Sequence, residues 1–226
     1  MKRIFEIFFV QLLVNINSKM MTKKLFVTGI GTDVGKTIIS AILTEALKAD
    51  YWKPIQSGYT DGLDSAKVKE LISNPLSKFH NERYLLKEPI SPHAAAELEK
   101  INISLSDFSL PETDNTNLVI EGAGGILVPI NNEIVIADLI EKFDSEVIIV
   151  SRNYLGSINH TLLTLNEIER RKLKLKGIIF NGNRNESTEN IILKKYQFNF
   201  VGRVNFHEEF DKETISKYAT EFKVKL

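Results

Sequence analysis

The 226-residue sequence contains no cysteine. Disulfide bridges, thiolate zinc sites, iron–sulfur clusters and cysteine nucleophiles are therefore excluded. This absence fits a reducing compartment, and we expect a cytoplasmic protein. Histidine is also scarce, and the four histidines (His80, His93, His160 and His207) show no spacing typical of metal ligands. A histidine-based metal site is therefore not expected.

The sequence also lacks an excess of either charge. Its 29 lysines and arginines balance 29 aspartates and glutamates, so the formal net charge is zero. Proteins that grip nucleic acid through its phosphates usually carry a basic excess. We therefore expect no nucleic-acid partner. The hydrophobic fraction of 43% and charged fraction of 26% are ordinary for a globular protein, and the length suggests one domain.

Residues 1–20 contain no apolar stretch long enough to span a bilayer. Glu6 and Gln11 interrupt their apolar run, and no small-residue cleavage site follows, which argues against a signal peptide. Met20 and Met21 stand just before the first clear strand. We interpret residues 1–20 as a disordered or dispensable N-terminal extension, with a weakly amphipathic helix as the alternative. A single domain is expected over residues 21–226, with no membrane partner.

From residue 23 onward, short apolar runs alternate with amphipathic segments. We predict strands at 25–29, 51–55, 118–122, 146–151 and 177–182, and helices at 36–48, from 64 onward and at 158–171. In the second strand, Pro54 indicates an end or an edge. Continuous β-branched runs alternating with such helices are typical of a three-layer, doubly wound α/β fold. Its sheet is mostly parallel and carries helices on both faces. Ligands of such sheets bind outside the carboxyl ends of the strands.

The segment GIGTDVGKT (29–37) lies between a predicted strand and a predicted helix. Its glycines allow a tight turn that points backbone N–H groups inward, toward a bound phosphate. Lys36 suits the β and γ phosphates of ATP, and Thr37 can offer its hydroxyl to Mg²⁺. Ile30 replaces the usual first glycine, so the loop is a variant. A chance glycine-rich turn is disfavoured because G-K-T opens a helix directly after an apolar strand. We therefore predict a P-loop NTPase fold.

A second glycine-rich strand exit is EGAGG (121–125). Glu121 ends a predicted buried strand, where its carboxylate can help hold Mg²⁺, and the glycines allow close approach to phosphate oxygens. Such exits are common, so the motif gains weight only beside the first loop. Asp64 is a further candidate ligand, although a helix N-cap explains this residue equally well.

Two segments suit a substrate. KPIQSG (53–58) places Lys53 at a strand end, where it could hold an anionic intermediate, and Ser57 could form a hydrogen bond to a substrate. Most lysines are solvated surface groups, so that alternative stays open. SRNYLGSINHTLLT (151–164) puts Gly156 and Asn159 at the start of a predicted helix, and its ordinary interpretation is a capped helix start.

GIGTDVGKT, KPIQSG, SPH (91–93), EGAGG and LGSINH, in this order, resemble the dethiobiotin synthetases over roughly residues 23–204. The first loop alone matches many ATPases, whereas KPIQSG, SPH and EGAGG together do not. The resemblance implies an ATP-dependent cyclo-ligase of biotin biosynthesis, with ATP and Mg²⁺ as cofactors. CO₂ forms a carbamate on one amine of 7,8-diaminononanoate, and ATP phosphorylates it. The second amine then closes a cyclic urea, giving dethiobiotin, ADP and phosphate. A homodimer is implied as well.

The resemblance also implies roles for individual residues. It makes Lys53, Lys36 and Thr32 catalytic, and Thr37, Asp64 and Glu121 the metal ligands. It assigns the diamine and its carbamate to Thr32, Lys53 and Ser57, and the carboxylate tail to Gly156 and Asn159 across a dimer interface. Asn181 would hydrogen-bond adenine. The full implied ATP set is Asp33, Val34, Gly35, Lys36, Thr37, Ile38, Asp64, Glu121, Gly122, Ala123, Gly124, Asn181, Gly182 and Asn205.

The chain departs from the family pattern in three places. Tyr154 stands where some relatives have lysine, so we expect recognition of the carboxylate tail to differ. Asn205 stands where relatives often have proline, so we expect the contacts to adenine there to differ as well. The stretch between Gly58 and Asp64 is short, so the alignment of Asp64 depends on its helix.

Three other functions share parts of this pattern. A partition-type ATPase shares the fold and loop but carries a lysine five residues before the loop lysine, where this chain has Gly31. A cobyrinate-type amidoligase usually needs a cysteine nucleophile to release ammonia, and the chain has none. A nucleotide-binding module without enzymatic activity would not need Lys53 and Ser57 beside the loop.

Overall fold

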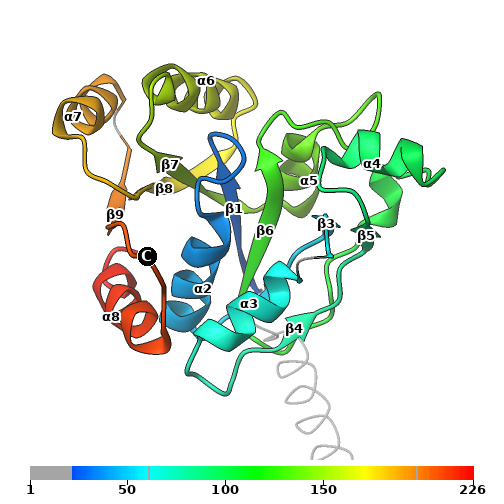
Figure 1. Ribbon diagram of the computed structural model, residues 1–226, viewed down its shortest axis with the longest axis horizontal. Coiled ribbons are helices and arrows are strands. Elements are labelled where there is room, and N and C mark those ends of the chain that lie inside the picture. Colours follow the sequence, from blue (N-terminus) through cyan, green and yellow to red (C-terminus); the bar gives the residue numbers. More distant parts are fainter. Residues whose placement is uncertain (1–21, 61, 197) are drawn as a thin grey trace, which may run out of the picture.

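The computed structural model describes residues 22–60, 62–196 and 198–226. The predicted extension at residues 1–20 lies outside them. A seven-stranded sheet forms the centre of the fold, in the order β4-β2-β6-β1-β7-β8-β9, and every strand pair in it is parallel (Figure 1). Its strands are β1 (Lys23–Gly29), β2 (Asp50–Trp52), β4 (Phe79–His80), β6 (Asn117–Gly125), β7 (Glu146–Arg152), β8 (Lys174–Asn181) and β9 (Phe200–Val204).

Helices cover both faces of this sheet. Connections from β1 run toward one edge and connections from β6 run toward the other, so right-handed crossovers place their helices on opposite faces. α2 packs against α3 and α8 on one face, while α5, α6 and α7 follow the connections to β7, β8 and β9 on the other (Figure 1). The bounds are α2 (Lys36–Leu47), α3 (Asp64–Leu71), α5 (Ile136–Phe143), α6 (Ser157–Arg170), α7 (Glu186–Lys195) and α8 (Lys212–Lys223). The predicted three-layer, doubly wound fold is confirmed.

The first βα unit shows how the sequence sets this arrangement. The strand residues Phe26 and Val27 are fully buried, as expected for a strand covered on both faces. In α2, Ile39, Ile42 and Leu43 form the buried stripe that packs on the sheet. The helix ends at Leu47, and the next residue, Lys48, adopts the left-handed conformation common at helix C-termini.

The prediction of one extended segment at 51–55 was wrong. The chain breaks between β2 and a separate strand β3 (Ile55–Ser57), which pairs with β5 (Tyr84–Leu86) in a two-stranded parallel sheet. Pro54 lies in the gap and has no N–H to continue the ladder of β2. This small sheet, with α4 (Pro92–Leu98) and a 3₁₀ turn at Leu105–Asp107, forms a flank beside the carboxyl end of β6 (Figure 1).

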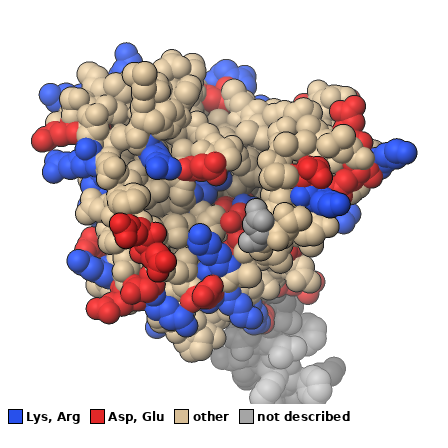
Figure 2. All heavy atoms as spheres, in the orientation of Figure 1, with Lys and Arg blue, Asp and Glu red and all other residues tan. Residues whose placement is uncertain are grey.

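The surface carries both signs of charge. Figure 2 shows lysines and arginines interspersed with aspartates and glutamates over the visible face, with uncharged residues between them. No helix among the described residues is long and apolar enough to cross a membrane.

Candidate active site

The loop between β1 and α2 stands at the carboxyl end of the sheet, beside the end of β6 (Figure 1). Gly35, the N-cap of α2, has φ of 94°, and a Cβ placed there would collide with Asn181 Nδ2. Only glycine fits this turn, which brings the N-terminus of α2 to the loop. Lys36 folds back and donates from Nζ to Gly31 O at 3.1 Å. Burial lowers the pKa of Lys36, although the nearby Glu121 carboxylate opposes that shift.

Ile30 explains why the loop departs from the usual glycine pattern. Its side chain is buried in the hydrophobic core, and its N–H donates to Val150 O at 3.1 Å. The residue therefore anchors the start of the loop to β7. A side chain at this position adds apolar packing without entering the phosphate cradle.

A buried charged cluster lies beside the loop. Lys53 Nζ is 2.6 Å from Asp64 Oδ2 and 2.9 Å from Glu121 Oε1. Thr37 Oγ1 lies 3.0 Å from an oxygen of each carboxylate, and its single hydrogen can serve only one of them at a time. Lys53 is 4% exposed and Glu121 is 1% exposed, so the interpretation of Lys53 as a solvated surface group is wrong.

The sheet register explains why these groups meet. Tyr51 of β2 is aligned with Val119 of β6, and the two strands are parallel. Side chains alternate between the faces of a strand, so Lys53 and Glu121, each two residues further on, project to the same face. Thr37, in the first turn of α2, covers that face.

Lys53 and Asp64 are both charged in their ion pair. Burial disfavours the Lys53 ammonium, but Glu121 and Asp64 outweigh it and raise the pKa of Lys53 above its ordinary value. Burial also disfavours the Asp64 carboxylate, but Lys53 outweighs it and lowers the pKa of Asp64. The Lys53 ammonium is therefore a fixed positive charge at neutral pH, held between two carboxylates.

The donor set fits Mg²⁺. Thr37, Asp64 and Glu121 supply hard oxygen donors, and Mg²⁺ commonly uses one or two carboxylates completed by substrate phosphates and water. In the described part of the chain, no group of three or more histidines, aspartates or glutamates could hold a metal alone. The N-cap interpretation of Asp64 was wrong: the cap residue is Leu63, and the Asp64 side chain turns toward Lys53.

The cluster and the loop share one pocket of about 740 Å³, a size typical of ligand sites. Twelve of the residues predicted for the site line this pocket: Thr32, Asp33, Gly35, Lys36, Thr37, Ile38, Lys53, Ser57, Asp64, Glu121, Ala123 and Gly124. The other predicted residues do not line it: Val34, Gly122, Gly156, Asn159, Asn181, Gly182 and Asn205. The side chain of Val34, itself a loop residue, is instead buried in the core.

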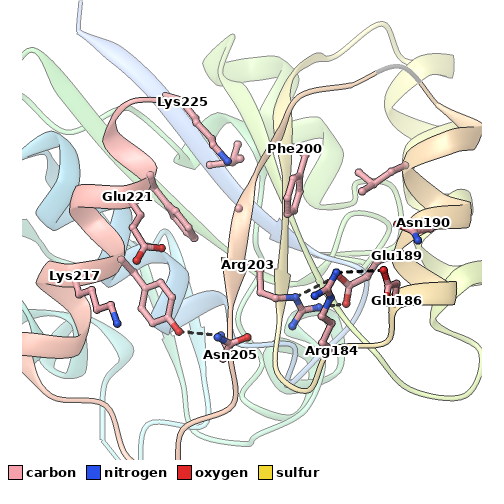
Figure 3. Close-up of a pocket in the computed structure, with 15 residues that line it drawn as sticks. Arg184, Glu186, Glu189, Asn190, Phe200, Arg203, Asn205, Lys217, Glu221 and Lys225 are labelled. Atoms are coloured by element: carbon pink, nitrogen blue, oxygen red, sulfur yellow. Dashed lines mark hydrogen bonds and ion pairs between the residues drawn. The ribbon is translucent and has the colours of Figure 1, made fainter.

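The two predicted adenine contacts stand at the ends of paired strands: Asn181 of β8 is aligned with Val204 of β9, the residue before Asn205. Asn181 Nδ2 donates to Val34 O at 2.8 Å, which ties the end of β8 to the phosphate loop and leaves its Oδ1 and second amide hydrogen available. Asn205 lines a separate groove along β9 and its N–H donates to Tyr218 Oη at 3.1 Å (Figure 3). In that groove Arg203 pairs with Glu189 of α7 (Figure 3). An adenine role for Asn181 and Asn205 stays a prediction.

The segment before α6 borders the loop from the other side. Gly156 is the N-cap of α6 with φ of 101°, and no side chain caps this helix. Tyr154 Oη lies 2.7 Å from His160 Nδ1 and 3.9 Å from the position a Cβ on Gly31 would take. The residue that replaces the lysine of some relatives therefore stands next to the phosphate loop.

Two features of the site were missed in the sequence. Tyr51 donates from its hydroxyl to Glu121 Oε2 at 2.9 Å. Gln56 accepts from Asp64 N–H at 3.3 Å, which links the small sheet to the start of α3. The alternation of strand side chains could have revealed Tyr51, because it stands two residues before Lys53 on the same strand face.

Comparison with known proteins places the chain in a family. A protein-family model described as "AAA domain" matches residues 23–214. The chain is 52% identical over 197 residues to an ATP-dependent dethiobiotin synthetase of Cytophaga hutchinsonii, covering 87% of this chain and 95% of the relative. It is 50% identical over 206 residues to the one of Christiangramia forsetii, covering 91% of this chain and 99% of the relative.

Similarity to solved structures shows the fold alone. A plasmid partition protein from Borrelia burgdorferi B31 bound to AMPPNP has a TM-score of 0.57 at 14% identity, covering 90% of this chain and 98% of its own. The MinC:MinD cell division complex of Aquifex aeolicus gives a TM-score of 0.53 at 12% identity, covering 90% of this chain and 94% of its own. These identities are far below those of the sequence relatives, and the lysine that marks partition ATPases is replaced here by Gly31. The chain belongs to the ATP-dependent dethiobiotin synthetase family.

Proposed function

We propose that this enzyme uses ATP and Mg²⁺ to convert 7,8-diaminononanoate and CO₂ into dethiobiotin, ADP and phosphate. One observation carries the proposal: a buried, charged lysine, Lys53, lies between two carboxylates beside a phosphate loop, within one pocket. A partition-type switch has its second lysine within the loop, at the position of Gly31 here, and does not need one at the end of β2. An enzyme that handles a carbamate and a carbamyl phosphate, both anions, does.

The proposed reaction has three steps, and two lysines stabilise the charges that it develops. An amine of the substrate adds to CO₂ and loses a proton, and a carbamate oxygen then attacks the γ phosphorus as ADP leaves. The second amine attacks the carbamyl carbon, loses a proton and expels phosphate. Lys36 neutralises charge on the transferred phosphoryl group, and Lys53 stabilises the carbamate and its phosphate.

The remaining groups position substrate and metal. Mg²⁺, held by Thr37, Asp64 and Glu121, would neutralise charge on the β and γ phosphates. Ser57 Oγ is buried in the pocket wall and has no hydrogen-bond partner among the described residues. A buried hydroxyl without a partner is destabilising, so a polar group of the substrate is its natural partner.

Product analysis tests the proposed reaction. The protein is incubated with ATP, Mg²⁺, ¹³C-bicarbonate and the diamine, and the products are followed by mass spectrometry. We expect one labelled carbon in the cyclic urea and one ADP per ring closed. Omission of the diamine should stop ATP turnover, and rapid ATP hydrolysis without it would contradict the proposal.

Replacing Glu121 with glutamine should raise the Mg²⁺ concentration needed for half-maximal turnover by at least about tenfold, because even groups behind a metal ligand have effects of that size. The change removes a charge and keeps the shape of the side chain. A Mg²⁺ titration at saturating ATP provides the measurement. Glu70→Gln, an exposed change on α3, is the control. An unchanged titration would remove Glu121 from the metal set.

We also propose that the enzyme is a homodimer formed around the start of α6. Leu155 is fully exposed, and Tyr154, Ile158 and Leu163 nearby are also exposed. Three of these residues stand close together in the chain, at 154, 155 and 158, and exposed apolar residues that gather in one place mark protein interfaces. Gly156 and Asn159 do not line the pocket of their own subunit. In such a dimer they could reach the carboxylate tail of a substrate bound to the partner subunit.

A charged residue at the centre of this surface should separate the subunits. We expect Leu155→Asp to shift the protein from dimer to monomer in light scattering after gel filtration, because the interface would bury an unpaired carboxylate. The control is Leu76→Asp, an equally apolar exposed position beyond α3. A monomeric unaltered protein, or a dimeric Leu155→Asp, would contradict the proposal.

A further inference from the structure

We propose that Tyr51 is a positioning residue that holds the Glu121 carboxylate in the orientation needed for metal binding. This inference rests on the proposed metal set and assigns a residue beyond it. Tyr51 lies on β2, behind the pocket, and is fully buried. It does not line the pocket, so it cannot contact substrate or nucleotide directly. Any effect on the reaction must therefore pass through Glu121.

The two carboxylate oxygens of Glu121 have different partners. Oε2 accepts from the Tyr51 hydroxyl at 2.9 Å, while Oε1 faces Lys53 Nζ at 2.9 Å and Thr37 Oγ1 at 3.0 Å. Only Oε1 therefore faces the groups that meet ATP and substrate. The hydrogen bond to Oε2 fixes the rotation of the carboxylate, which decides whether Oε1 points toward the metal position.

Tyr51 differs from the other two partners of Glu121 because it has no proposed role in binding metal or substrate. In the proposed function, Thr37 turns its oxygen to the metal and Lys53 serves the carbamate. Both contacts to Oε1 therefore change as ligands bind, whereas the contact to Oε2 can persist. A tyrosine hydroxyl carries its hydrogen at neutral pH and can donate it to a carboxylate oxygen.

The ring of Tyr51 is held independently of its hydroxyl. It packs against Phe79 of β4 with ring centroids 5.6 Å apart, and its backbone N–H donates to Lys78 O at 2.9 Å. Tyr51→Phe removes one oxygen and no carbon, so this packing is kept. The variant consequently separates the hydrogen bond from the packing.

The experiment measures metal binding without turnover. Mn²⁺, a paramagnetic substitute for Mg²⁺, is titrated into the full-length protein saturated with ADP, and free Mn²⁺ is followed by electron paramagnetic resonance. We expect Tyr51→Phe to weaken Mn²⁺ binding by about tenfold, the lower end of the effects seen for groups that orient metal ligands. ADP affinity without metal should be unchanged. The control is Tyr84→Phe, which removes a hydroxyl that donates to the Asp107 carboxylate at 2.7 Å away from the pocket.

A double-mutant cycle with Glu121→Gln distinguishes the possible failures. If Tyr51 acts through Glu121, Tyr51→Phe should have little further effect on Mn²⁺ binding in the Glu121→Gln background. If Glu121→Gln alone leaves Mn²⁺ binding unchanged, the proposed metal set is wrong. If Glu121→Gln weakens Mn²⁺ binding but Tyr51→Phe does not, only the positioning role is wrong. Failure of Tyr51→Phe to fold, or a loss of thermal stability with unchanged Mn²⁺ affinity, would overturn the proposal in favour of a structural role.

Discussion

Replacing Lys36 with alanine is expected to lower kcat/KM for ATP by at least about 10²–10³-fold, the loss typical when one preorganised group is removed from a charged transition state. The side chain is buried at the start of α2 and currently donates to Gly31 O inside the loop. When ATP occupies the loop, the same ammonium can turn to the β and γ phosphates. Alanine leaves the backbone cradle intact, so the loss should reflect the missing charge.

Steady-state kinetics and calorimetric ADP binding test this expectation. The matched control is Lys69→Ala, an exposed lysine on α3 that does not line the pocket, and it should leave both unchanged. Circular dichroism and thermal unfolding confirm that both variants are folded. Unchanged nucleotide affinity together with unchanged turnover in Lys36→Ala would contradict the assignment of the phosphate loop.

The phosphate loop was predictable because its function depends on local chain geometry. Glycine at position 35 is required by a backbone turn with φ of 94°, and Lys36 and Thr37 follow it within the first turn of one helix. Apolar runs predicted the strands for a related reason, since a strand covered on both faces must be apolar throughout. Local requirements of this kind restrict the residue type at each position and can therefore be recognised in the sequence.

The contacts between distant segments were harder to predict. Tyr51 and Glu121 are separated by 70 positions, and only the parallel register of β2 with β6 brings them together. Pro54 indicated an end or edge of the extended segment at 51–55, but only the pairing of β3 with β5 shows that a separate strand follows it outside the main sheet. For the same reason, the sequence alone could not show whether Asp64 caps a helix or pairs with Lys53.

Replacing Lys53 with methionine is expected to reduce kcat by about 10²–10³-fold while leaving ATP binding nearly intact, because its proposed partner is the carbamate and not the nucleotide. Methionine has a similar length but no charge. Single-turnover measurements with labelled bicarbonate can locate the loss. Loss of ATP binding in this variant, measured by calorimetry, would count against the role, and Lys69→Met is the matched control.

The free energy of unfolding of Lys53→Met should also depend on Mg²⁺. In the unaltered chain the Lys53 ammonium lies between Asp64 and Glu121, so it compensates the two carboxylates that would hold the metal. Removing it leaves two facing negative charges, which should cost about 3 kcal/mol in the free energy of unfolding, the low end for a broken buried pair because Asp64 is partly exposed.

Mg²⁺ should offset that loss, because a cation that binds only the folded state stabilises it. In the unaltered protein Mg²⁺ has to displace the ammonium from the carboxylates, so its effect on the unfolding temperature should be smaller than in Lys53→Met. Thermal unfolding with and without Mg²⁺, with Na⁺ at matched ionic strength as the control, measures the difference. Equal shifts in the two proteins would show that Lys53 and the metal do not share the carboxylates. A larger shift in the variant would identify Lys53 as the counterion that holds the site together until ATP and metal arrive.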